Sequence, residues 1–91
     1  MIEIKNIQGE VIARVDAERL CFANLSHLDL RGADLRGECL AWTAFFGTNL
    51  EGADLRGANL CQAGIDLYQL EKAITDNTTV FPEEREFAGH I

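Results

Sequence analysis

The sequence predicts an all-β solenoid, a chain wound into stacked turns, and three regularities support this fold class. Every fifth residue is large and apolar over nine consecutive units. The residue two positions earlier is mostly small, and the residue directly before is Asn or Asp in six of the nine units. Glycine stands two positions after the large residue in five units. The nine large residues, which we expect to face inward, are Leu25, Leu30, Leu35, Leu40, Phe45, Leu50, Leu55, Leu60 and Ile65.

A period of five residues fits neither a straight helix nor a straight strand. On an α-helix, five steps rotate the large residue by about 140°, which spreads the series around the whole surface. On a flat strand, an odd spacing puts successive large residues on opposite faces. One face stays buried only if the chain bends once in every unit, which makes a coil with short straight sides. Alanine suits the position beside the large residue because the interior of a narrow coil is closely packed.

Two units show the repeat most fully, Ala33–Gly37 and Ala53–Gly57, and both read ADLRG. They resemble the A-[DN]-L-x-x unit of the pentapeptide-repeat family, and the match is tight over residues 23–67. The resemblance implies a right-handed quadrilateral β-helix with four pentapeptides per turn, and therefore about 2–3 coils in this chain. The motif is blurred around residues 38, 43 and 63, where the register of large residues is nevertheless kept.

The segments on either side of the repeats are expected to cap the coil, because the end turns of a solenoid expose apolar surface and unpaired strands. We expect an N-terminal β cap over residues 1–15, either a hairpin that turns at Gln8-Gly9 or one bent strand that enters the first coil. The β-helix is expected over 16–67, and a C-terminal cap helix and tail over 68–91. The helix begins near Leu67 and is stopped by the Thr-Asp-Asn run at 75–77, after which an extended segment brings Phe81 back onto the last coil.

The composition limits the classes of function. A chain of 91 residues is enough for one small domain, and an apolar content of 47% excludes wholesale disorder. A net charge of -7 makes the chain a poor ligand for phosphate, so we expect no direct nucleic-acid partner and no membrane binding. No apolar run approaches the about 20 residues of a membrane span, and we expect no signal peptide. Cys21, Cys39 and Cys61 form no CxxC pair, and free thiols fit a reducing, cytoplasmic location.

No residue pattern predicts catalysis. Ser26, His27 and Asp29 are close in sequence, but a coil turns them in different directions, whereas a catalytic triad must converge. The cysteines lack the close pairs of a zinc site, and the glycines recur at the fixed period of turns rather than in a phosphate loop. A narrow packed solenoid also leaves no large pocket. We therefore expect no enzyme activity, no catalytic, cofactor-binding or metal-binding residue, no cofactor and no small-molecule substrate.

Four units per turn would place residues 20 apart in columns, with about 4.8 Å between successive coils. An outward column then contains two aromatic residues followed by a glutamine at position 62, and a third aromatic residue points outward on the adjoining side. Clustered exposed aromatic residues mark interfaces, although the alternative is that the hairpin or the C-terminal segment covers them. We name this surface the aromatic corner and expect its protein-interaction residues to be Phe22, Ala41, Trp42, Phe46 and Leu67.

The same column map makes three further predictions. Arg31 stacks on Glu51 as part of a solvated ladder. Glu38 occupies an inward position, where a carboxylate is costly; it is either a functional acid, or a residue that turns outward or finds backbone donors. Cys21 and Cys61 lie two coils apart, about 9.6 Å at strand spacing, whereas a disulfide needs Cα atoms within about 7 Å.

The first functional expectation is a non-catalytic interaction or structural module of unknown protein partner, which acts through the aromatic corner or by self-association as a homodimer. The resemblance implies an alternative, because some pentapeptide-repeat proteins mimic duplex DNA, bind type II topoisomerases such as gyrase and confer fluoroquinolone resistance. The acidic pI of about 4.6 agrees in sign. Residues 23–67, however, carry six acids and three arginines, a net charge of -3, whereas duplex DNA has one charge per about 1.7 Å. The DNA mimic therefore ranks second.

Overall fold

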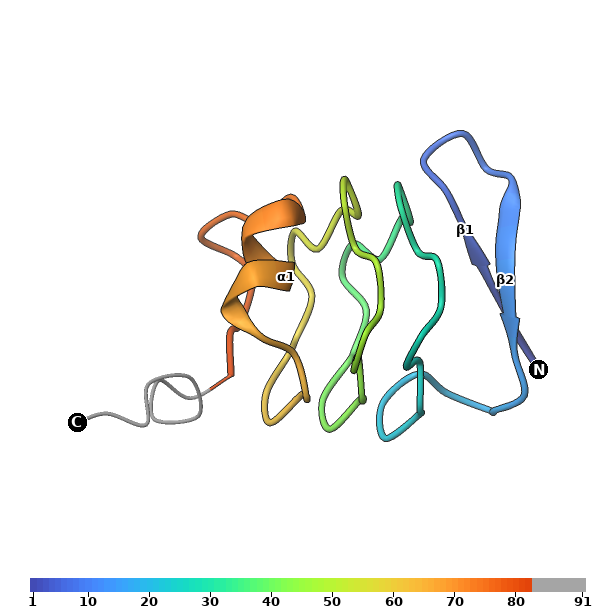
Figure 1. Cartoon of the computed structure of the whole chain (residues 1–91), viewed down its shortest axis with the longest axis horizontal. Coiled ribbons are helices and arrows are strands. Elements are labelled where there is room, and N and C mark those ends of the chain that lie inside the picture. The colour runs from blue at the N-terminus through green and yellow to red at the C-terminus, as the bar shows by residue number, and fades with distance from the viewer. Residues whose placement is uncertain (83–91) are drawn as a thin grey trace.

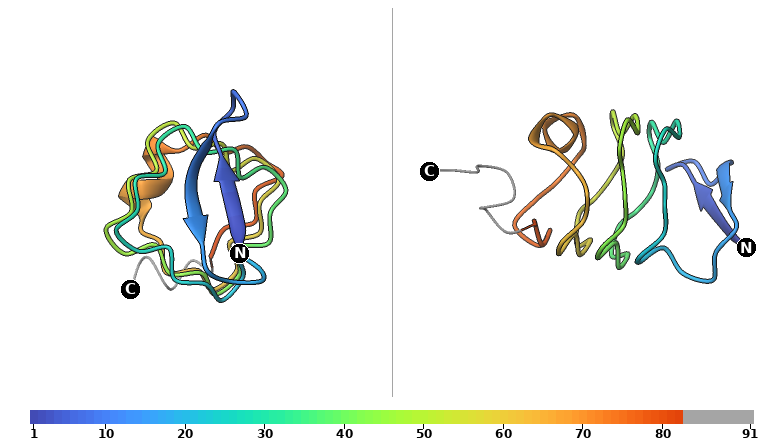
Figure 2. Two further views of the ribbon diagram at one scale, coloured as in Figure 1. Left: turned by 90° about the vertical axis from the view of Figure 1, so that its right-hand side faces the viewer. Right: turned by 60° about the horizontal axis from the view of Figure 1, so that its bottom comes forward.

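The structure is a computed structural model that describes residues 1–82 and shows a coil with a cap at each end (Figure 1). The elements follow in the order β1 (Ile2–Lys5), β2 (Val11–Val15) and, after the coil, α1 (Leu67–Lys72). Seen along its axis, the coil's turns superimpose on one closed outline, and the β1–β2 hairpin lies across one end (Figure 2). The architecture is of the β-helix type, as the five-residue period predicts.

A parallel backbone ladder joins successive turns of the coil. It pairs residues 20 positions apart, for example Asn24 with Ala44 and Asp34 with Asp54. The Leu25 N–H donates a hydrogen bond of 2.8 Å to the carbonyl of Ala44, and the same pattern repeats along the chain. Each turn therefore contains four five-residue units, which places equivalent side chains of neighbouring turns above one another.

The large residues together form one apolar core that runs through the coil. Eight of the nine are 2% exposed or less, and Ile65, near α1, is half-buried. Two of the neighbouring small positions hold threonine in place of alanine. The buried hydroxyls of Thr43 and Thr48 donate hydrogen bonds of 2.7 Å to the backbone carbonyls of Leu20 and Leu25 in the preceding turn. Threonine is tolerated in this core because its hydroxyl is paired there.

The N-terminal segment closes one end of the coil as an antiparallel hairpin. β1 pairs with β2 from Ile2 opposite Val15, and the register shifts between Ile4 and Lys5. Ile4 is buried among the residues of the core, and the carbonyl of Lys5 accepts a hydrogen bond of 2.7 Å from the Asp34 N–H. An antiparallel bridge between Asn6, directly after β1, and Ala33 joins the hairpin to the parallel ladder of the coil. A hairpin, rather than one bent strand, is what covers the first coil.

α1 takes the place of one side of the coil near its C-terminal end, and the short helix predicted there is confirmed. The Asp66 carboxylate accepts a hydrogen bond from the Gln69 N–H, and the Gln69 side chain accepts one from the Asp66 N–H. This reciprocal cap fixes where the helix starts. Gln69 is buried, and its Nε2 donates to the carbonyls of Phe45 at 2.6 Å and Thr48 at 3.0 Å. The predicted helix stop at residues 75–77 is wrong, because the helix ends at Lys72, Ala73 is already extended and the ladder resumes at Ile74.

The extended segment predicted over residues 77–82 is wrong at its start. The chain makes a turn there before Val80 rejoins the ladder, with a spacing of 21 residues instead of 20. Phe81 remains 43% exposed, so it packs only partly against the coil. The tail predicted after Pro82 lies outside the described residues.

Charged side chains pair most closely within a unit, although Arg36 Nε also lies 3.9 Å from Asp54 Oδ2 of the next turn. Arg31 is predicted to stack on Glu51, but its ion-pair partner is Asp29 of its own unit, with Arg31 Nη2 2.7 Å from Asp29 Oδ2. The bend at each unit brings the arginine after the leucine back toward the aspartate before it. The backbone N–H of the arginine also donates a hydrogen bond to that aspartate carboxylate. Three pairs share this geometry, namely Asp29–Arg31, Asp34–Arg36 and Asp54–Arg56.

The Asp54–Arg56 pair predicts a specific response to acid. The Asp54 side chain is 2% exposed, and hydrogen bonds from the Arg56 side chain hold the pKa of its carboxyl below the ordinary 3.8. A lowered folded pKa stabilises the protein at pH values above the unfolded pKa, and that stabilisation is lost as the pH falls through the folded pKa. In urea unfolding between about pH 6 and about pH 2, we expect Asp54→Asn to lose less stability on acidification than the wild type. Parallel pH profiles would contradict this role.

Glu38 is exposed, so its expected inward orientation is wrong and the outward alternative is confirmed. Its backbone nevertheless stays in the ladder, because its carbonyl accepts a hydrogen bond of 2.9 Å from the Asn59 N–H. A side chain that turns outward keeps its carboxylate hydrated and avoids the desolvation cost of the core. The three cysteines, Cys21, Cys39 and Cys61, are free thiols.

Candidate interaction surface

The aromatic corner is an exposed apolar surface along one edge of the coil. Phe22, Trp42 and Phe46 are 71%, 56% and 66% exposed, and Leu67, at the start of α1, is 56% exposed. Ala41 is half-buried. No described segment covers the three aromatic side chains, so within residues 1–82 the alternative of a covering hairpin or C-terminal segment does not hold.

The two aromatic residues of the outward column lie one above the other. The ring centroids of Phe22 and Trp42 are 6.3 Å apart, and the ring planes differ by 3°. The ladder holds this alignment, because the Phe22 N–H donates to the carbonyl of Ala41 and the Trp42 N–H donates to that of Cys61. The stack places two parallel rings at the surface on a rigid backbone.

The backbone of this column is strained in a way that most of the coil avoids. The last position of a unit adopts a left-handed conformation, and glycine with φ between 69° and 75° fills it in five units. Phe22, Trp42 and Gln62 stand at the equivalent position with φ of 67°, 62° and 60°, and His27 has 65°. A side chain in this region costs roughly 1–2 kcal/mol per residue. The aromatic residues therefore occupy positions where glycine would suit the fold better.

Two glycines make room for the side chains beside the column. A Cβ atom on Gly64 would lie 3.4 Å from the Phe46 ring, so the ring sits directly on that backbone. A Cβ atom on Gly47 would lie 2.6 Å from His27 Nδ1, which is closer than a Cβ atom approaches another heavy atom. Neither contact is evident from the sequence. The one signal for them is the departure from the motif at 63–64, where glycine replaces the usual Asn or Asp.

An open groove of about 470 Å³ runs beside the corner, between the Phe46 ring and the start of α1. Its remaining lining is Gln62, two glycines, an alanine, Ile65, and the two capping residues Asp66 and Gln69. The carboxylate of Asp66 is the one charged group among the lining residues. The groove therefore joins an aromatic wall and an uncharged floor to a single anionic end.

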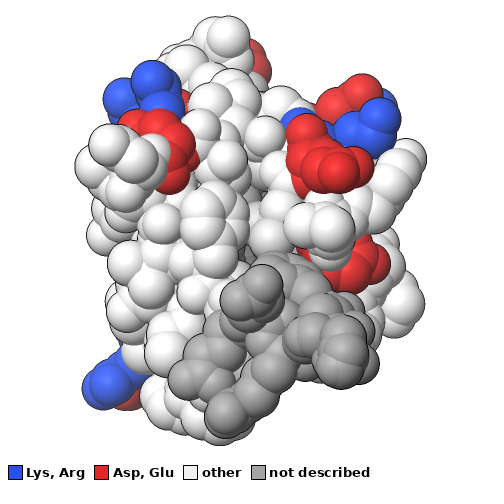
Figure 3. All heavy atoms as spheres, turned by 90° about the vertical axis from the view of Figure 1, so that its left-hand side faces the viewer, with Lys and Arg blue, Asp and Glu red and all other residues white. Residues whose placement is uncertain are grey.

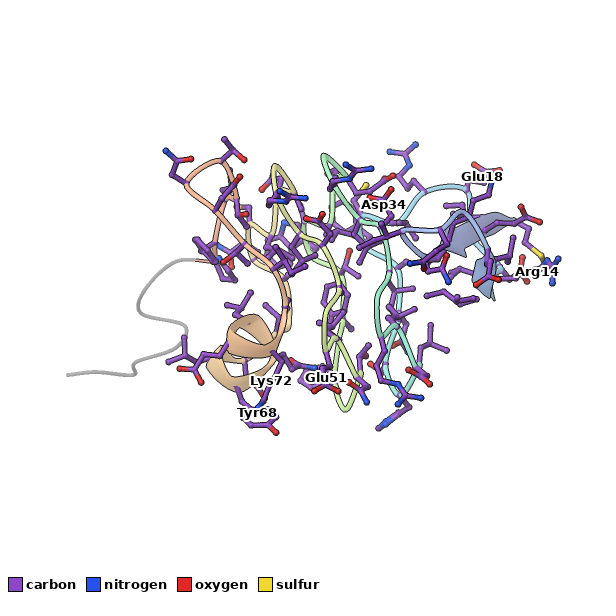
Figure 4. The ribbon with its side chains drawn as sticks, turned by 90° about the horizontal axis from the view of Figure 1, so that it is seen from above. Arg14, Glu18, Asp34, Glu51, Tyr68 and Lys72 are labelled. Carbon is purple, nitrogen blue, oxygen red and sulfur yellow. The ribbon has the colours of Figure 1, made fainter. Side chains whose placement is uncertain are left out.

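A second groove, of about 400 Å³, shares Gly47, Asp66 and Gln69 with the first. Tyr68 and Lys72 of α1 face Glu51 of the neighbouring turn across it (Figure 4), and Lys72 Nζ lies 5.3 Å from the centre of the Tyr68 ring. At the α1 end of the molecule, the visible Lys and Arg side chains lie next to acidic ones at the rim, and the described surface between these groups is uncharged (Figure 3). Lys72 thus has the Tyr68 ring and Glu51 as neighbours in the second groove.

The described residues offer no arrangement for metal or triad chemistry. Residues 1–82 contain no group of three or more His, Cys, Asp or Glu side chains that could hold a metal ion. Ser26, His27 and Asp29 do not converge, since the Asp29 carboxylate is bonded to Arg31. None of the helices in this part of the chain is both long and apolar enough to cross a membrane.

Comparison with known proteins supports the reading of the repeat. The family model described as pentapeptide repeats matches eight copies over residues 19–37 and 39–66, which together make up more than half of the chain. The break in the match falls at Glu38, the side chain that turns out of the coil. No curated protein and no solved structure matched the chain. The five-residue period, the 20-residue ladder and this match together show that the chain belongs to the pentapeptide repeat family.

Proposed function

We propose that this chain is a rigid, non-catalytic module that binds a partner protein through the aromatic corner. Membership of the pentapeptide repeat family indicates a structural or interaction role. We take the coil to be right-handed, with about 2–3 turns, as the family resemblance implies; the 20-residue ladder supports four units per turn. The proposal assigns no catalytic residue, cofactor or small-molecule substrate to the chain.

The observation that carries the proposal is the strained backbone under Phe22 and Trp42. Both side chains are more than half exposed, so they contribute little to the core, and both stand where five other units use glycine. The stacking of two aromatic rings is worth about 0.5–1.5 kcal/mol, which offsets the backbone strain only in part. Strained positions persist where they serve a function, and exposed aromatic anchors are enriched in protein interfaces.

This proposal is tested by replacing the two aromatic residues with glycine. We expect Phe22→Gly/Trp42→Gly to be at least as stable as the wild type, because relief of backbone strain at two positions outweighs the loss of one stacking contact. We expect the same double variant to lose the protein that the immobilised wild type captures. Gln62→Gly is the matched control, since it makes the same backbone change in the same column without removing a ring. Equal capture of the same protein by the double variant would contradict the proposal.

Self-association through the corner is distinguishable from binding to another protein. Trp42 is the only tryptophan of the chain, so its emission reports on the corner alone. Light scattering at several concentrations gives the solution mass, while the emission spectrum is recorded on the same samples. A mass that doubles as the Trp42 emission moves to shorter wavelength would assign the corner to a homodimer. A constant monomer mass leaves the corner available to a different protein.

We do not favour the DNA-mimic alternative. Its support is the acidic composition, but Asp29, Asp34 and Asp54 are each paired with an arginine two residues away. Charges paired in this way present both signs along the shaft instead of the continuous negative charge of a duplex. Inhibition of gyrase supercoiling by micromolar protein would reverse this ranking.

A further inference from the structure

We propose that the groove beside Phe46 binds an arginine side chain from a basic segment of the partner. The inference rests on the proposed function and deepens it, because it names the chemistry that the partner presents. The groove adjoins the aromatic corner through Phe46 and Gln62, so one partner segment can contact both. Of the two grooves next to α1, this is the one whose lining contains no lysine or arginine.

The anionic end of the groove has one carboxylate oxygen to offer. Asp66 Oδ1 accepts the capping hydrogen bond of 2.8 Å from the Gln69 N–H. Among the described residues, no hydrogen bond or ion pair involves Oδ2 of this exposed side chain. The helix cap fixes the carboxylate in place, because the Gln69 side chain is itself held by the carbonyls of Phe45 and Thr48. A cation that enters the groove thus meets a positioned acceptor.

The wall and floor of the groove suit a long cationic side chain with a flat head. The Phe46 ring lies against Gly64 and the residue is 66% exposed, so most of the side chain is accessible to a cation. The uncharged floor of Ala63, Gly64 and Ile65 matches an aliphatic stem. A guanidinium is planar, stacks on aromatic rings and pairs with carboxylates through a rigid fork, whereas the lysine ammonium is a strongly hydrated point charge. Arginine is therefore the better match.

Charge complementarity supports a basic partner at longer range as well. The chain carries a net charge of -7, which attracts a cationic segment before contact is made. The arginines of the coil do not compete for the groove, because Arg31, Arg36 and Arg56 are each bound to an aspartate of their own unit. These three side chains are therefore not the occupant that we propose.

The test uses the full chain and two synthetic peptides of equal length. The first is acetyl-Arg-Leu-Arg-Leu-Arg-amide, and the second replaces every arginine by citrulline, which keeps the shape and removes the charge. Titration of ¹⁵N-labelled protein is followed by NMR. We expect the arginine peptide to shift the amide signals of Gly47, Gly64 and Asp66, and the citrulline peptide to leave them in place.

Two variants and one control separate the groove from general attraction to an acidic protein. Asp66→Asn removes the charge and keeps the helix, because asparagine caps a helix as well as aspartate. Phe46→Leu removes the ring and keeps an apolar wall. We expect each variant to weaken binding of the arginine peptide about tenfold, which corresponds to about 1.4 kcal/mol. Glu71→Gln makes the same change of charge on α1 outside the groove lining and is expected to bind within about twofold of the wild type.

Equal binding of the arginine peptide to Asp66→Asn and the wild type would overturn the inference. The same holds if the citrulline peptide binds as tightly, or if the shifted signals lie away from the groove. These outcomes leave the proposed function standing, since it is judged by the glycine variants at Phe22 and Trp42. A partner that is lost with the glycine variants but retained by Asp66→Asn would support the corner and reject the arginine site.

Discussion

Replacing Phe45 by alanine is expected to destabilise the protein by about 3–5 kcal/mol, whereas the same change at Phe46 is expected to alter stability by no more than about 0.5 kcal/mol. The two residues are adjacent in sequence and identical in chemistry. Phe45 is 0% exposed and fills the coil at a position where the other turns hold leucine or isoleucine, while Phe46 is 66% exposed. Loss of the buried ring removes its transfer free energy and leaves a cavity in a narrow core.

Urea unfolding followed by circular dichroism measures both variants under one condition, and the exposed Phe46→Ala variant is the internal control. A loss of about 3–5 kcal/mol is a large part of the stability of a small domain, so Phe45→Ala is expected to be substantially unfolded at physiological temperature. A small effect at Phe45, or equal effects at both positions, would mean that the five-residue register does not decide which side chains form the core.

Replacing Gln69 by leucine is expected to cost about 2–4 kcal/mol, although the new side chain is apolar and of similar size. The Gln69 amide donates to the carbonyls of Phe45 and Thr48 inside the protein. Leucine leaves the Thr48 carbonyl without its donor and the Phe45 carbonyl with the Thr48 N–H alone. The variant also loses the side-chain half of the helix cap at Asp66. The free energy of unfolding is therefore expected to fall because hydrogen bonds are lost, and not because the core is packed less well.

The control for this experiment is Gln8→Leu, which makes the same chemical change at an exposed position in the hairpin loop. It is expected to change the stability by no more than about 0.5 kcal/mol. Hydrogen exchange adds a local measurement, because loss of the Gln69 amide should accelerate exchange in α1 and in the turn that contains Thr48 before it affects β1. Unchanged exchange together with wild-type stability would show that the two carbonyls do not need this donor.

The sequence predicts the coil well because one physical requirement controls it. Burial of one large residue in every five forces one bend per unit, and the stacking of Phe22 on Trp42 follows from columns 20 residues apart. The short helix near Leu67 was also predictable, although it ends at Lys72, before the predicted stop at residues 75–77. These features depend on short-range periodicity, which the sequence displays directly.

Side-chain partners were less predictable because they depend on direction as well as position. The column map placed Arg31 beside Glu51, but the bend of the unit brings Asp29 closer. Glu38 was placed inside by its register and lies outside, because an outward rotation keeps its carboxylate in water. The left-handed backbone at Trp42 was likewise hidden, since the sequence shows a tryptophan where the conformation favours glycine.

The β-helix type of fold and the inward register follow from the strict five-residue period of the sequence, and the aromatic column follows once the family resemblance supplies four units per turn. The folded structure was needed to show that a hairpin and not a bent strand closes the first coil, which carbonyls Gln69 satisfies and where a groove opens between Phe46 and Asp66. These contacts join segments about 20 or more residues apart, with their geometry set by the packing of α1 and the hairpin against finished turns. Periodicity specifies the turns, and the orientation of whole elements specifies the surfaces between them.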